Sequence, residues 1–233
     1  MNRNLLLLAF CQALLLTNNV AFIAMNGLVG LALAPRPWMA TLPVTGYVVG
    51  AALAAPWVAS LQARWGRLRC FQLGLVVAVL SCGLCAWAAW AQQFWGVVAA
   101  TVVAGFYSAN GALYRFAGPE LVAPSLKEKA MSWVLAGGVV GAFTGPNLAA
   151  ATRDWLVVPF VGTYLALMAV GLLGLALMSA VRFPAHRVAP AGAAAGRSLR
   201  ELAAQPLFLA AVLGAALGYG VMNLLMAATP IAM

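Results

Sequence analysis

Long apolar runs separated by short polar gaps make up most of the chain. A helix needs about 20 apolar residues to cross the ~30 Å hydrocarbon core of a bilayer, and runs of about 18 are candidates. The pattern predicts seven membrane spans, near residues 5–33, 39–61, 70–91, 94–116, 130–151, 156–181 and 206–229. Proline marks several of their ends, because it lacks a backbone N–H and disfavours helix in the residue before it. The alternating pattern of membrane strands is absent, so the predicted fold is an all-α membrane protein.

Basic residues are concentrated in alternate gaps between these runs. The amino terminus, the end of the fourth run and the gaps after the second, fourth and sixth runs hold Arg3, Arg64, Arg67, Arg69, Arg115, Lys127, Lys129, Arg182, Arg187, Arg197 and Arg200. The other gaps hold only Arg36 and Arg153. Since cytoplasmic loops carry the excess of Lys and Arg, the amino terminus is predicted to be cytoplasmic. The predicted location is a plasma membrane, with a bacterial inner membrane favoured.

Composition excludes an ordinary soluble domain. The chain is 65% hydrophobic and 7% charged, whereas soluble domains carry about 25% charged residues. Its net charge of +9 does not indicate nucleic acid, because the basic residues lie in short gaps rather than on one soluble face. Membrane lipid is therefore the expected surroundings, and no nucleic-acid partner is predicted.

The chain offers no convincing metal or cofactor motif. Cys82 and Cys85 form a C-x-x-C pair, but they lie in an apolar run with no histidine or carboxylate beside them. Together with Cys11 and Cys70 they are predicted to be buried thiols. His186 lies in a polar gap and is predicted to be solvated. The sequence thus predicts no cofactor and no metal site.

The gap at 182–205 is the one long connection and divides the chain. It is rich in Ala, Gly, Pro and Arg, which predicts a flexible cytoplasmic linker. The predicted domains are a six-span bundle at 1–181, the linker at 182–205, and a seventh span at 206–233 that begins a missing second half. The carboxy-terminal half is accordingly expected as a partner.

Two similar glycine patterns suggest an internal repeat. The second run contains Gly46-Tyr-Val-Val-Gly50-Ala51, and the fifth contains Gly137-Gly-Val-Val-Gly141-Ala142. Each lies in the middle run of a group of three, and three spans per unit place the second copy upside down in the membrane. Inverted three-plus-three repeats are a known transporter construction.

The gap after the second run resembles the signature loop of the major facilitator superfamily, Gly-x-x-x-Asp-Arg-x-Gly-Arg/Lys-x-Arg/Lys. Here it reads Ala59-Ser-Leu-Gln-Ala63-Arg64-Trp65-Gly66-Arg67-Leu68-Arg69. Arg64, Gly66, Arg67 and Arg69 match, while alanine replaces the first glycine and the aspartate. The resemblance implies that this loop latches the cytoplasmic face. A plain basic loop set by membrane topology is the alternative.

The fifth run resembles the antiporter motif of the same superfamily. In GGVVGAFTGPNLAA, the residues Gly141, Gly145 and Pro146 match its G-x-x-x-G-P core. Small residues four apart also allow close helix packing without any special role. Together the two motifs imply a six-helix half bundle of the major facilitator type with an inverted repeat.

The resemblance implies a central substrate cavity, and polar residues at helical spacing supply candidates to line it. These are Asn18, Asn19, Phe22 and Asn26 in the first run, Tyr107, Asn110 and Tyr114 in the fourth, Asn147 in the fifth, and Tyr219, Met222 and Asn223 in the seventh, with Tyr47 a weaker candidate. Amides are costly in lipid and are expected to face the bundle interior. Each of them has the alternative role of an interhelical hydrogen bond.

Charged residues near the spans give a further expectation and a conflict. Arg115 is expected to anchor or gate the cytoplasmic interface, with Glu120 as a candidate partner. The four acids Glu120, Glu128, Asp154 and Glu201 lie outside the spans or at their edges, although proton relays normally need an intramembrane carboxylate. The antiporter motif suggests ion-coupled transport, whereas the lack of an intramembrane carboxylate gives no residue to carry the proton.

Three functions are compatible with the sequence to different degrees. The leading hypothesis is secondary active or facilitative transport of a small neutral or amphipathic solute by alternating access, with efflux before uptake. The alternative is an inactive truncated remnant or a membrane scaffold. An intramembrane enzyme is disfavoured, because the sequence shows neither a nucleophile–base set nor an H-E-x-x-H metal motif.

Overall fold

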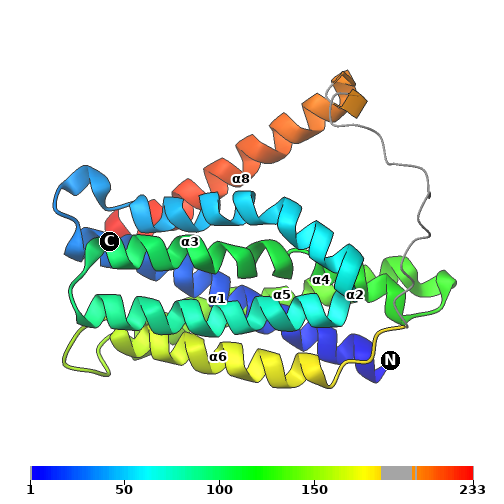
Figure 1. Cartoon of the computed structure of the whole chain (residues 1–233), viewed down its shortest axis with the longest axis horizontal. Coiled ribbons are helices and arrows are strands. Elements are labelled where there is room, and N and C mark those ends of the chain that lie inside the picture. The colour runs from blue at the N-terminus through cyan, green and yellow to red at the C-terminus, as the bar shows by residue number, and fades with distance from the viewer. Residues whose placement is uncertain (1, 185–200, 203, 233) are drawn as a thin grey trace.

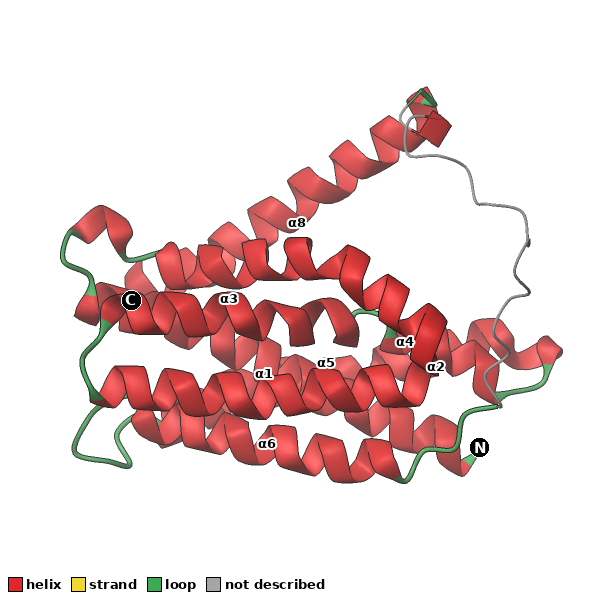
Figure 2. Ribbon diagram, viewed as in Figure 1, coloured by secondary structure: helices red, strands yellow, loops and turns green. Residues whose placement is uncertain are grey.

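The computed structural model describes residues 2–184, 201–202 and 204–232, and within the last helix side chains only as far as Met226. Every regular element in this part of the chain is helical (Figure 2). The α-helices are α1 (Arg3–Leu33), α2 (Leu42–Trp90), α3 (Phe94–Gly111), α4 (Tyr114–Ala117), α5 (Lys127–Thr152), α6 (Val161–Ser179) and α8 (Pro206–Ala232), and the short 3₁₀ turns are η1 (Pro37–Met39), η2 (Gly118–Leu121) and η3 (Pro124–Leu126). The linker prediction for 182–205, with His186, falls mostly outside the described residues.

Six of the described helices are long and apolar enough to cross a membrane. The apolar runs were therefore correctly predicted as helices. The expected spans 39–61 and 70–91 correspond to the two limbs of α2, which are separate helical segments joined by a non-helical residue, Gly66. The expected span 94–116 is divided into α3 and α4 by a break after Gly111.

The two limbs of α2 meet at Gly66, where the backbone leaves the helical region. Gly66 has φ 79° and ψ 172°, a combination that is essentially confined to glycine. The residue is also buried, so the bend cannot be relaxed by moving into solvent. The signature-loop glycine thus sets the direction of the chain between the two limbs of α2 (Figure 1).

Gly66→Ala is expected to destabilise the fold by about 1–3 kcal/mol, because a Cβ makes this backbone conformation strained. The matched control is Gly83→Ala in the second limb of α2, where an added Cβ meets only Met168 Sδ at 3.8 Å. Alanine favours helix over glycine, so the control should be neutral or stabilising. Thermal unfolding of the purified variants in detergent checks this, and equal midpoints for both variants would contradict the strained bend.

Both glycine patterns lie where two helices approach closely. An added Cβ on Gly50 would overlap the backbone of Val102 in α3, and one on Gly46 would lie 2.9 Å from Thr101 Oγ1. On α5, an added Cβ on Gly137 would overlap the carbonyl group of Ala9 in α1. The second run therefore packs on the fourth, and the fifth run packs on the first. In an inverted repeat the second run corresponds to the fifth and the fourth to the first, so the two contacts would be equivalent. The repeat itself stays a prediction.

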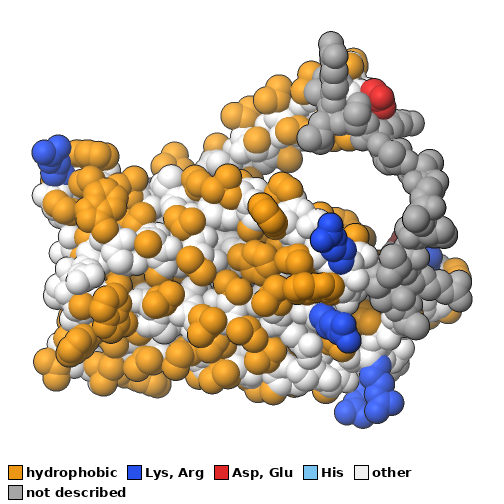
Figure 3. Space-filling model, in the orientation of Figure 1, with side chains coloured by type: hydrophobic (Ala, Val, Ile, Leu, Met, Phe, Trp, Pro, Cys, Tyr) orange, Lys and Arg blue, Asp and Glu red, His pale blue; other side chains and the backbone are white. Residues whose placement is uncertain are grey.

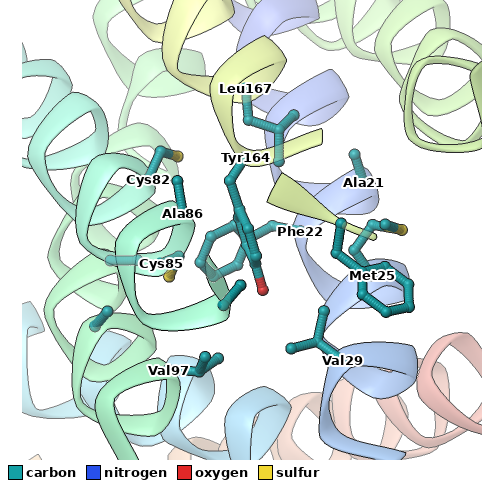
Figure 4. Close-up of a cluster of buried hydrophobic side chains, with 14 of the residues drawn as sticks. Ala21, Phe22, Met25, Val29, Cys82, Cys85, Ala86, Val97, Tyr164 and Leu167 are labelled. Atoms are coloured by element: carbon teal, nitrogen blue, oxygen red, sulfur yellow. The ribbon is translucent and has the colours of Figure 1, made fainter. Parts of the chain in front are cut away.

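An aromatic and thiol core lies between α1, the second limb of α2, and α6. Tyr164 of α6 projects toward Phe22 of α1, with ring centroids 6.1 Å apart, and Cys82 and Cys85 lie beside them (Figure 4). All four cysteines are free and buried, as predicted from their apolar surroundings. The Tyr164 hydroxyl donates to Asn26 Oδ1 at 2.8 Å, so the core contains a satisfied polar pair.

The two ends of the bundle differ in their connections and charge. The bend of α2, the segment from α4 to α5 and the amino terminus lie at one end, while the α1–α2 and α5–α6 connections lie at the other (Figure 1). On the face drawn in Figure 3, Lys and Arg side chains gather mainly at the amino-terminal end, and a smaller basic patch lies at the opposite end. This arrangement agrees with the alternation of basic gaps. Which end faces the cytoplasm stays a prediction.

Candidate functional site

A pocket of about 250 Å³ lies between α8 and the faces of α1, α2 and α3. Its lining residues are uncharged and combine aromatic rings, amide, hydroxyl and small apolar groups: Ile23, Tyr47, Val48, Ala51, Ala52, Ser108, Tyr219 and Asn223. Of the predicted cavity residues, Tyr219 and Asn223 line it directly, together with the weaker candidate Tyr47. Ordinary ligand pockets have this mixture of apolar walls and a few polar groups.

Tyr47 is held in place on one side of this pocket. Its hydroxyl donates to Asn19 Oδ1 at 2.8 Å, and its ring centroid lies 5.0 Å from that of Phe22. The side chain is 3% exposed. Asn19 and Phe22, both predicted cavity residues, therefore position an aromatic wall of the pocket.

Asn223 contributes a polar atom that has no partner. Its amide nitrogen donates to the carbonyl of Tyr219, one turn earlier in α8, at 2.9 Å. Its Oδ1 is buried and makes no hydrogen bond with any described residue. The side chain is only 9% exposed, whereas the neighbouring Tyr219 and Met222 are about half exposed.

Most of the other predicted amides and tyrosines are bonded or packed inside the bundle. Asn18 donates to the carbonyl of Leu167 in α6 at 3.2 Å, and Asn110 of α3 donates to that of Cys70 in α2 at 2.8 Å. Asn26 accepts its hydrogen bond from Tyr164 of α6. These amides thus have the interhelical role that the sequence left as an alternative. Whether any also contacts a solute stays a prediction.

The remaining candidates lie apart from the pocket. Tyr107 and Tyr114 are buried in a second core cluster, and the ring of Tyr114 lies 4.7 Å from that of Phe71. Asn147 is exposed on α5, with its amide bonded to the carbonyl of Phe143 at 2.7 Å. The structure therefore does not bring these three to the α8 pocket.

Two polar residues were not singled out from the sequence. Ser108 lines the pocket from α3. Gln12 is 7% exposed on α1, and its Oε1 is buried without a partner among the described residues. The available signal was spacing, since Gln12 precedes Asn19 by two helical turns and lies on the same face of α1.

The signature loop forms a charged cluster at the amino-terminal end of the bundle. Arg67 pairs with Glu120 in η2, with Nη2 2.6 Å from Oε1, and its Nη1 donates to Gln62 Oε1 at 2.8 Å. Glu120 is therefore the partner of Arg67, which corrects the suggested pairing with Arg115. Arg115 instead lies with its guanidinium carbon 4.9 Å from the ring centre of Phe116, while Arg64 and Arg69 are exposed.

The antiporter-like motif lies at the contact between α5 and α1. An added Cβ on Gly141 would overlap the carbonyl oxygen of Ala13, and one on Gly145 would lie 2.9 Å from that of Thr17. The helix continues through Pro146 to Thr152. Gly141 and Gly145 therefore allow the backbones of α1 and α5 to pack closely.

Other parts of the described chain hold pockets that lack the predicted cavity residues. A pocket of about 470 Å³ at the amino-terminal end includes Glu120 and Lys129, but none of the predicted cavity residues. Among the described residues, no group of three His, Cys, Asp or Glu side chains is placed to hold a metal ion. The α8 pocket combines predicted cavity residues with an uncharged lining, and on that ground we take it as the candidate site for a solute.

The described helices define an integral membrane protein, and the α8 pocket gives it an uncharged candidate site. The chain is similar to the riboflavin transporter RfnT of Brucella anthropi, with 34% identity over 233 residues, covering 99% of this chain and 58% of that relative. The chain thus spans less than two thirds of the relative's length. The relative is a transporter, in agreement with the expectation that the chain is not an enzyme. No family model matches the chain, and no solved structure does.

Proposed function

We propose that this chain is part of a transporter for riboflavin or a closely related planar heterocycle, bound in the pocket between α8 and the rest of the bundle. The observation that carries the proposal is the similarity to a riboflavin transporter along 99% of the chain. The pocket supports it, because its lining is uncharged and suits an uncharged solute.

The chemistry of the lining matches that of a flavin ring. Riboflavin combines a flat aromatic ring system with imide and carbonyl groups along one edge and a sugar alcohol chain. Tyr47 and Tyr219 offer rings for offset or edge contacts, which contribute about 0.5–1.5 kcal/mol beyond area burial. Ser108 and Asn223 offer a hydroxyl and an amide for the polar edge.

The mechanism we propose is the alternating access of a major facilitator protein. The Arg67–Glu120 pair joins the bend of α2 to the segment after α4. We expect this pair to hold that end of the bundle together, with that end facing the cytoplasm. The carboxy-terminal half would supply the opposite wall of the cavity, and the amino terminus would be cytoplasmic in a bacterial inner membrane. Efflux and uptake both remain directions to be tested.

Flux of labelled riboflavin in a bacterial riboflavin auxotroph tests this function. Cells should express the 233-residue chain or the same chain extended through its downstream reading frame, and uptake and release should both be followed. We expect saturable flux of labelled riboflavin that excess unlabelled riboflavin inhibits and thiamine does not inhibit. Flux in the extended form alone would assign the rest of the cavity to the second half, whereas no flux in either form would favour the remnant or scaffold.

A further inference from the structure

Asn223 is unusual within its helix. Of the described side chains of α8, which end at Met226, Asn223 alone is buried, and its neighbours are exposed or half exposed. A polar amide is thus the α8 group inserted most deeply toward the bundle. An apolar residue would serve that position better if packing were its sole role, because burying a polar group without a hydrogen bond is costly.

The hydrogen bonds around Asn223 leave one acceptor without a donor. Its amide nitrogen is held by the carbonyl of Tyr219, which fixes the side chain and directs Oδ1 away from that bond. The Tyr47 hydroxyl has a single hydrogen, and that hydrogen is donated to Asn19. Asn223 Oδ1 is therefore a positioned acceptor, and a buried acceptor without a partner costs about 1–3 kcal/mol.

We propose that Asn223 is a specificity-determining residue whose Oδ1 accepts a hydrogen bond from an imide or amide N–H on the edge of a planar heterocyclic solute. The inference rests on the proposed function and adds the part of the solute that is recognised. In riboflavin this donor is the N–H between the two carbonyl groups of the pyrimidine ring. A site built around such a bond rejects an analogue that lacks the donor more strongly than an apolar pocket could.

The test compares riboflavin with 3-methylriboflavin, in which a methyl group replaces that hydrogen. Binding to purified protein in nanodiscs is followed by flavin fluorescence. The wild-type chain is expected to bind riboflavin about tenfold or more tightly than the methylated analogue. In Asn223→Leu, which has similar volume and no acceptor, the preference should fall to near unity, mainly through weaker binding of riboflavin.

Two controls keep the outcome clear. Thr45→Val removes an exposed hydroxyl that bonds only to its own helix at Thr41, so it should retain the full preference. Asn223→Ala repeats the loss of the acceptor with a smaller side chain, in case the leucine variant does not fold. Equal binding of both flavins by wild type, or an unchanged preference in the Asn223 variants, would overturn this inference. Binding of neither flavin by wild type would instead overturn the proposed function.

Discussion

Replacing Gly141 by leucine is expected to lower the thermal unfolding midpoint by roughly 5–10 °C. An added Cβ at this position would overlap the carbonyl oxygen of Ala13, and the next nearest atoms are Leu16 Cβ and Thr17 N, both at 2.8 Å. Backbone atoms cannot move aside as a flexible side chain can. The larger side chain must therefore push α1 and α5 apart along their contact.

The matched control for this change is Gly218→Leu in α8, where an added Cβ meets no atom within 4 Å. The two variants make the same chemical change in membrane helices, and only the first is placed between packed backbones. Fluorescence-detected size-exclusion chromatography after heating measures both midpoints. If Gly141→Leu unfolds at the wild-type temperature, α1 and α5 do not pack in close backbone contact.

Ala52→Phe is expected to reduce riboflavin flux at least tenfold while leaving the fold intact. Ala52 lines the α8 pocket and is exposed, so a phenyl ring there takes up space in the pocket without entering the core. The change removes room for the solute, so riboflavin binding should fail along with flux. Labelled riboflavin flux in cells and the amount of folded protein in the membrane give the two readouts.

Ala55→Phe is the control for the blocking ring. Ala55 lies less than one turn further along α2, is also exposed, and does not line the pocket. It carries the same added bulk on the same helix and should transport as wild type does. Equal flux in the two variants would place the solute elsewhere, with the charged pocket near Glu120 and Lys129 as the next candidate.

The hydrophobic pattern predicted where the helices are, but not how they are joined. Apolar runs must be helical in a bilayer, since every backbone polar group has to be satisfied internally. The polar gap between the second and third runs was predicted, but the backbone conformation of Gly66 that turns the chain there was not, because hydropathy carries no information about dihedral angles. The same holds for the break between α3 and α4, which lies inside an apolar run.

The candidate site was harder to predict than the fold, because periodicity gives the face of a helix and not the partner opposite it. Asn18, Asn26 and Asn110 satisfy the spacing rule, yet they bond to neighbouring helices. Asn223 satisfies the same rule and keeps a free acceptor in the pocket. Ser108 lines that pocket and carried no periodic signal. Only three-dimensional packing distinguishes these cases.

Riboflavin counterflow in proteoliposomes containing purified protein tests the central claim most directly, because no other cellular component is present. Vesicles loaded with unlabelled riboflavin are expected to accumulate labelled riboflavin transiently when they contain the wild-type or Ala55→Phe protein, and not when they contain Ala52→Phe. Accumulation that is equal in all three proteins would contradict the assignment of the pocket. The absence of counterflow in both the 233-residue chain and its extended form would contradict the proposal that this protein moves flavins.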